Sequence, residues 1–123
     1  MTDLRSPDCR LYVDAEMSDT ELLGLIMQMV FAPEAPGRAE VDVFKNEDYD
    51  TRRRLQFPQG FLYFRYYIDL YMPDCTREAQ AALAGLLLES LWEMNIPAVA
   101  ASTFEDLLPE RGGYKSRAIP WAD

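Results

Sequence analysis

Tyrosines and charged residues alternate along an apolar segment in the middle of the chain. Tyr63, Tyr67 and Tyr71 fall on one parity, together with Arg65 and Asp69. Successive side chains of a β-strand point to opposite faces, so these five residues would share one face of a sheet. Tyrosine rings bury large areas at low entropic cost and are frequent hot spots of protein–protein binding. The spacing therefore predicts a partner-binding face.

The same parity argument, applied to two earlier segments, brings further rings and acids to that face. Phe44 and Phe61 are among them, with Tyr12 and several carboxylates. The predicted partner-binding residues are Tyr12, Asp14, Glu40, Asp42, Tyr63, Arg65, Tyr67, Asp69 and Tyr71. Two alternatives stay open: cross-strand aromatic pairs that only stabilise the sheet, or a C-terminal tail, residues 112–121, that folds over them.

Catalytic chemistry has little support in the sequence. The chain contains no histidine, so proton transfer near pH 7 would need a carboxylate or lysine with a strongly shifted pKa. Nucleophile elbows, phosphate loops, dinucleotide-binding glycine motifs and metal-ligand spacings are all absent. Asp14 with Glu16, or Asp42 with Asp69, would form a carboxylate pair, but solvated surface acids are the simpler expectation. We predict no catalytic residue, no cofactor and no metal.

Hydrophobic periodicity predicts the elements that position these residues. Alternation predicts strands over residues 10–16, 39–44 and 61–72, and a short apolar run predicts a buried strand over 98–101. Ser18 with Glu21 has capping-box spacing before a helix that runs to about Phe31. Thr76 is the expected cap of a second helix, which Asn95 would end in a left-handed conformation.

The order strand, helix, strand, strand, helix, strand predicts an α+β fold. We expect a ferredoxin-like βαββαβ sandwich, a four-stranded antiparallel sheet with both helices on one face. An α+β fold with the C-terminal segment as a further strand is the alternative. The 123 residues fit a single domain, with residues 45–60 as a long connection or hairpin arm and residues 112–123 as an irregular tail.

The two cysteines and the one run of basic residues are expected to have structural roles, not to form a functional site. Cys9 and Cys75 are expected at the same end of the sheet as free thiols, although oxidation would let them pair. Arg52, Arg53 and Arg54 follow a group of acids and are expected to form salt bridges with them. A contact with an anion or a partner is the alternative for these arginines.

Charge narrows the class of partner. The formal net charge is −9, and residues 1–50 account for −8 of it, with 12 acids against 4 bases. Such a field repels phosphate backbones and anionic membranes and attracts basic proteins. The N-terminus has no apolar stretch of signal-peptide length, so cytoplasmic location is expected. We predict a basic protein partner, no direct nucleic-acid ligand and no membrane association.

Two segments carry a resemblance to a known group. Residues 57–66, FPQGFLYFRY, and residues 104–114, FEDLLPERGGY, resemble small, acidic, single-domain bacterial proteins. Some members of this group resemble immunity proteins that neutralise polymorphic or contact-dependent toxins. The resemblance implies an acidic cytoplasmic protein that binds a cognate toxin directly, and it carries over no catalytic residue. Alternatives are a small ferredoxin-like ligand-binding domain or enzyme, or a homodimeric structural protein.

Overall fold

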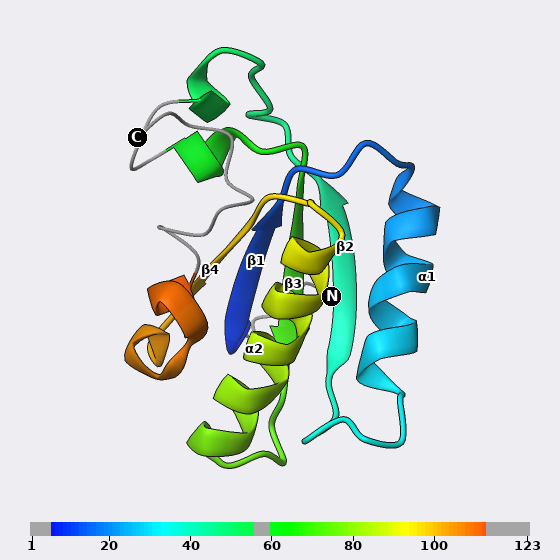
Figure 1. The fold of residues 1–123 in the computed structure, drawn as a ribbon, viewed down its shortest axis with the longest axis vertical. Helices are drawn as coiled ribbons and strands as arrows, with labels where there is room; N and C mark the ends of the chain where they lie inside the picture. The colour runs from blue at the N-terminus through cyan, green and yellow to red at the C-terminus, as the bar shows by residue number, and fades with distance from the viewer. Residues whose placement is uncertain (1–5, 56–59, 113–123) are drawn as a thin grey trace.

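A computed structural model describes residues 6–55 and 60–112 (Figure 1). The chain alternates strands and helices, with short 3₁₀ helices in the connections. The elements are β1 (Cys9–Val13), α1 (Asp19–Val30), β2 (Glu40–Lys45), η1 (Arg53–Leu55), η2 (Gly60–Tyr63), β3 (Tyr66–Tyr71), α2 (Arg77–Glu93), β4 (Ala98–Ser102), η3 (Glu105–Leu107) and η4 (Pro109–Gly112). Most of the predicted C-terminal tail, residues 113–123, lies outside the described residues.

The four strands form one sheet in the order β2-β3-β1-β4, and every neighbouring pair is antiparallel. The predicted α+β class, the four-stranded antiparallel sheet and the two helices are therefore confirmed. The arrangement is compatible with a ferredoxin-like sandwich. Figure 1 shows α2 in front of the central strands and α1 beside β2, with the β2–β3 connection standing above one end of the sheet.

The main core lies between the helices and one face of the sheet. Alternate residues of β1 and β3, such as Leu11 and Ile68, are fully buried there against Ile26 of α1 and Leu87 of α2. We call this the helix-covered face, and the opposite side the outer face. A second, smaller cluster consists of Phe61, Phe64 and Val99, with Tyr12 packed against it.

Capping side chains begin both helices as expected. The Ser18 hydroxyl accepts a hydrogen bond from the Glu21 amide at 3.1 Å, and the Thr76 hydroxyl accepts one from Ala79 at 3.1 Å. The Ser18 hydroxyl also contacts the Glu21 carboxylate at 3.1 Å, so the glutamate reaches the capping side chain itself. Asn95 has a φ of 59°, which confirms the left-handed position after α2.

The long strand predicted over residues 61–72 is wrong in its first half. Residues 60–63 form η2, and the strand begins only at Tyr66. A Cβ on Gly60 would lie 2.5 Å from the Arg54 carbonyl oxygen, so the chain passes η1 too closely for any side chain there. This approach brings Phe61 and Phe64 into the second cluster. Strand alternation over residues 61–72 would place Phe64 on the same face as Tyr66, Ile68 and Leu70, but Phe64 belongs to the second cluster and those three belong to the main core.

Candidate functional site

Two rows of side chains cross the outer face from one edge of the sheet to the other. Register places Phe44, Tyr67, Tyr12 and Val99 in one row, and Asp42, Asp69, Arg10 and Ala101 in the next. Phe44 stacks on Tyr67 with centroids 5.0 Å apart and an interplanar angle of 25°. Tyr12 packs edge-on against Phe61 at 5.2 Å. The parity prediction for Tyr12, Phe44 and Tyr67 is confirmed.

Arg10 joins the two rows. Its Nε donates to Oδ1 of Asp69 at 2.7 Å and its Nη2 donates to Oδ2 at 3.1 Å, a bidentate pair between directly opposed residues. The guanidinium carbon also lies 4.5 Å from the centre of the Tyr67 ring. The hydrogen bond that Arg10 donates to Asp69 raises the pKa of Arg10 above its ordinary value. The pair holds one cation against the ring that Phe44 stacks on.

Asp69 corrects the expectation of solvated surface acids. The residue is only 4% exposed, although Asp42 stands directly opposite on β2. Two neighbouring carboxylates repel each other, and the bidentate Arg10 on the other side compensates Asp69. Asp69 therefore supports the arginine and is not an exposed contact residue, while Asp42 is exposed.

A hollow of about 530 Å³ opens on this part of the outer face. We call it the β2–η2 hollow. Rings of the sheet and of η2 line it together with the turn that follows β2. The lining residues are Arg10, Tyr12, Phe44, Lys45, Asn46, Glu47, Asp48, Leu62, Tyr63 and Tyr67.

Asn46 fixes the wall of the hollow. Its side-chain amide donates to the carbonyl oxygens of Leu62 at 2.9 Å and Phe64 at 2.7 Å, and its Oδ1 accepts from the Asp48 amide at 3.0 Å. One side chain thus ties the turn after β2 to the residues that precede β3. A hydrogen bond of this kind contributes about 1 kcal/mol to stability.

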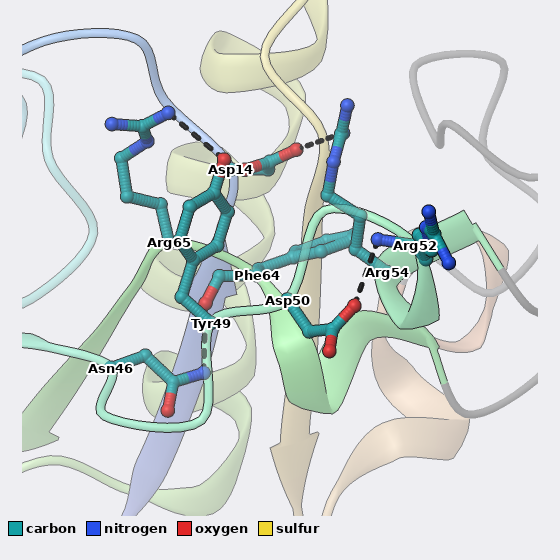
Figure 2. Close-up of polar contacts among 8 residues, drawn as sticks. All are labelled: Asp14, Asn46, Tyr49, Asp50, Arg52, Arg54, Phe64 and Arg65. Atoms are coloured by element: carbon teal, nitrogen blue, oxygen red, sulfur yellow. Dashed lines mark hydrogen bonds and ion pairs between the residues drawn. The ribbon is translucent and has the colours of Figure 1, made fainter.

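Two further predicted residues, Asp14 and Arg65, form contacts with side chains of the β2–β3 connection (Figure 2). Asp14, which directly follows β1, forms an ion pair with Arg54. Arg65 donates to the Tyr49 hydroxyl at 3.0 Å, with its guanidinium carbon 4.7 Å from that ring. The buried Nε atoms of Arg54 and Arg65 have no hydrogen-bond partner within the described residues. The Asp14–Arg54 pair therefore attaches the connection to the end of β1, whereas the Arg65–Tyr49 contact lies within the connection itself.

The predicted salt bridge between Arg54 and the acids just before it in the chain is wrong, because Arg54 pairs with Asp14, 40 positions earlier. Asp50 instead accepts from the backbone amides of Arg52 and Arg53, both at 2.8 Å (Figure 2 shows the first). The amide of Arg53, followed by that of Arg52, lowers the pKa of Asp50. The Asp50 carboxylate therefore binds backbone amides at the start of η1. Its closeness in sequence to the arginines had instead predicted an ion pair with their side chains.

Glu40 and Tyr71 lie elsewhere. Opposed to each other in the register, they line a second hollow, of about 650 Å³, with Phe31 and the residues around Cys75. Cys9 is buried and Cys75 is partly buried, and both are free thiols. The predicted set therefore divides: Tyr12, Tyr63 and Tyr67 meet at the β2–η2 hollow, whereas Glu40 and Tyr71 do not reach it.

Sequence reasoning left several lining residues out of the predicted set. Phe44 lies on the predicted face but is not among the predicted partner-binding residues. Arg10 is also missing from that set, although it shares the parity of Tyr12, which is a signal for the same face. Strand alternation would place Leu62 on the face opposite to Tyr63, yet Leu62 lines the same hollow and is 38% exposed. Asn46 carries no sequence signal for its role, because the carbonyls that it binds are brought near by the fold.

In the part of the chain that the structure describes, no group of three or more histidines, cysteines or carboxylates is arranged to hold a metal ion. The same residues contain no helix with the length and apolar character needed to cross a membrane. Comparisons of the chain with family models, with curated proteins and with solved structures return no match.

Proposed function

We propose that this chain is a protein-binding module, an immunity protein that neutralises a cognate bacterial toxin by direct contact. The observation that carries the proposal is the row Phe44, Tyr67 and Tyr12 beside a hollow on the outer face of the sheet. Phe44 is 40% exposed although its ring is large and apolar. Exposed aromatic side chains grouped with a hollow are typical of interaction sites.

Charge supports a basic protein as the partner. The net charge of −9 favours encounter with a cationic surface and disfavours nucleic acid. The acidic N-terminal half includes β2, which is an edge strand of the sheet and carries Glu40 and Asp42. Cytoplasmic location is part of the proposal, as is the assignment of the fold to the ferredoxin-like sandwiches. The resemblance of residues 57–66 and 104–114 to immunity-protein-like sequences is the basis for naming a toxin.

The first test is a pull-down of the tagged protein from its own cells at low and moderate salt. A single stoichiometric basic protein should co-elute, and co-expression should suppress its toxicity. Recovery should fall with added salt, because the Debye length shrinks from about 10 Å at 0.1 M to about 3 Å at 1 M. A monomeric protein that captures nothing at either salt concentration would contradict the proposal.

The second test addresses the surface. Tyr63→Ala and Tyr67→Ala should each weaken partner binding by more than about 1 kcal/mol if these rings are hot spots. Tyr71→Ala is the matched control, because Tyr71 lines the other hollow. Unchanged affinity in both of the first two variants would remove the outer face from the proposal.

The size of the β2–η2 hollow favours one second candidate, a small-ligand domain. Its volume of about 530 Å³ lies within the usual range of ligand pockets. In that case a small molecule should raise the melting temperature of the wild type, and the shift should disappear in Tyr67→Ala. A homodimer through the same face would instead show a dimer in sedimentation velocity.

A further inference from the structure

The β2–η2 hollow is lined by aromatic and other apolar side chains and by exposed charged residues, which we call its rim. Two exposed apolar residues line the hollow, Phe44 of β2 and Leu62 of η2. Asn46, which follows β2, donates a hydrogen bond to the Leu62 carbonyl and so connects the two segments. Within residues 6–55 and 60–112, the one ring that Phe44 contacts is Tyr67. Phe44 remains 40% exposed beside that stack, so part of its side chain is accessible to an incoming group.

The charges around the hollow favour a cation as that group. Arg10 lines the hollow, but Asp69 holds its guanidinium in a bidentate pair. Lys45 is the other cation of the lining, against two rim carboxylates, Glu47 and Asp48, and the exposed Asp42 of the adjoining row adds a third acid. A cation over an aromatic face is attracted by the ring quadrupole, and guanidinium is the side-chain group that most often makes this contact.

We propose that the β2–η2 hollow receives an arginine-bearing loop of the protein partner. The guanidinium packs on the ring of Phe44 and pairs with Glu47 or Asp48, while the aliphatic stem lies against Leu62. This inference rests on the proposed protein-binding function and names the chemistry of the partner at that site.

A second copy of this chain is a poorer occupant. A two-fold interface places the same patch of both copies face to face. Asp42, Glu47 and Asp48 would then approach the same three carboxylates, in molecules that each carry a charge of −9. Like charges directly opposed across an interface are destabilising. A basic segment of a different protein meets no such repulsion.

The experiment needs no knowledge of the partner. The probe is the peptide acetyl-Arg-Gly-Arg-amide, with acetyl-citrulline-Gly-citrulline-amide as the control, because citrulline keeps the shape of arginine and lacks its charge. Binding is followed by ¹H–¹⁵N NMR titration of the full chain. The arginine peptide should shift the amides of residues 44–48, 62–63 and 67, and the citrulline peptide should shift them far less.

Variants locate the effect. Glu47→Gln combined with Asp48→Asn should weaken arginine-peptide binding about tenfold, since both rim carboxylates lose their charge. Phe44→Leu keeps an apolar side chain but removes the ring and should weaken binding about threefold. The control is Glu89→Gln with Glu93→Gln, the same change in net charge on two exposed residues of α2, and it should leave affinity unchanged.

Three outcomes would overturn the inference: equal binding of both peptides, shifts spread over the acidic surface, or a control variant that loses as much affinity as the rim variant. A dimer that dissociates in Phe44→Leu would make a second copy the occupant and would overturn it too. The two proposals fail separately. Capture of a partner without arginine-peptide binding at the hollow contradicts only this inference, and specific peptide binding without a captured partner contradicts only the proposed function.

Discussion

The two faces of the sheet are built on different physical principles, and β3 shows both within six residues. Tyr66, Ile68 and Leu70 are buried in the helix-covered core, where side chains without charge fill space. Tyr67 and Asp69 alternate with them on the outer face, each in a defined pairing with a ring or a charge. Burial of apolar area stabilises the helix-covered face, whereas ion pairs and ring contacts fix the side chains of the outer face.

The difference between the two faces is compatible with the proposed binding function. Apolar burial on the helix-covered face needs no partner and provides most of the stability. On the outer face, ion pairs and ring contacts fix side-chain positions in the unbound protein, which would lower the entropy lost in the binding that we propose. Arg10 is an example, because Asp69 and Tyr67 hold it from two sides.

The largest expected effect comes from the helix-covered face. Ile68→Ala should lower the free energy of unfolding by about 3–4 kcal/mol, since it removes a fully buried side chain and leaves a cavity. Tyr67→Ala, one residue earlier and half-buried, should cost about 1–2 kcal/mol. Urea unfolding followed by circular dichroism measures both, and equal costs would refute the contrast between the faces.

A smaller but sizeable effect is expected from the Arg10–Asp69 pair. Arg10→Met leaves the buried Asp69 carboxylate uncompensated and should cost about 2–3 kcal/mol, a figure reduced here because Arg10 is partly exposed. The double variant Arg10→Met with Asp69→Leu should recover much of that loss, because no buried charge remains. A double variant less stable than Arg10→Met alone would mean that the outer face depends on this pair for packing as well as for charge.

The attachment of the β2–β3 connection should matter less. Arg54→Met breaks the pair with Asp14 and should cost about 1–2 kcal/mol, less than a fully buried pair because the Arg54 side chain is 27% exposed. Hydrogen exchange of residues 46–55 should accelerate more than that of β1 and β3. Arg52→Met, a change at an exposed neighbouring arginine, is the control and should leave both measurements unchanged.

The smallest effect concerns pH and Asp50. The amides of Arg53 and Arg52 lower its pKa below the usual 3.8 in the folded chain. The unfolded chain therefore binds more protons between the two values, and the contribution of Asp50 is present above about pH 4 and disappears as the pH falls through the lowered pKa. NMR titration of the Asp50 carboxyl should give a midpoint below 3.8, and Asp50→Asn should differ least from wild type in acid. A midpoint at or above 3.8 would contradict the capping geometry.

Local patterns were sufficient for the regular elements. Ser18 and Thr76 cap the helices that periodicity predicted, and Asn95 ends the second one. The strand bounds agree to within three residues except at the start of β3, where an apolar run satisfied strand and 3₁₀ helix equally well. No local signal there reports that Gly60 must pass Arg54 at close range.

The candidate site was predictable only in part, because part of it also depends on contacts between segments distant in the chain. Parity correctly placed Tyr12, Phe44 and Tyr67 on one face, because side-chain direction in a strand depends only on sequence position. Parity does not report what covers that face. The β2–β3 connection covers the β1–β4 side with Phe61 and Phe64 and leaves the hollow on the β2–β3 side.

The sequence by itself determined the helices, their caps, the strand faces and the acidic charge, since each depends on residues a few positions apart or on composition. The tertiary structure decided the pairs: Arg10 with Asp69 across 59 positions, Asp14 with Arg54 across 40, and Asn46 with two carbonyls 16 and 18 positions away. Such contacts depend on where the folded backbone places two distant segments, and helical or strand periodicity carries no information about that placement.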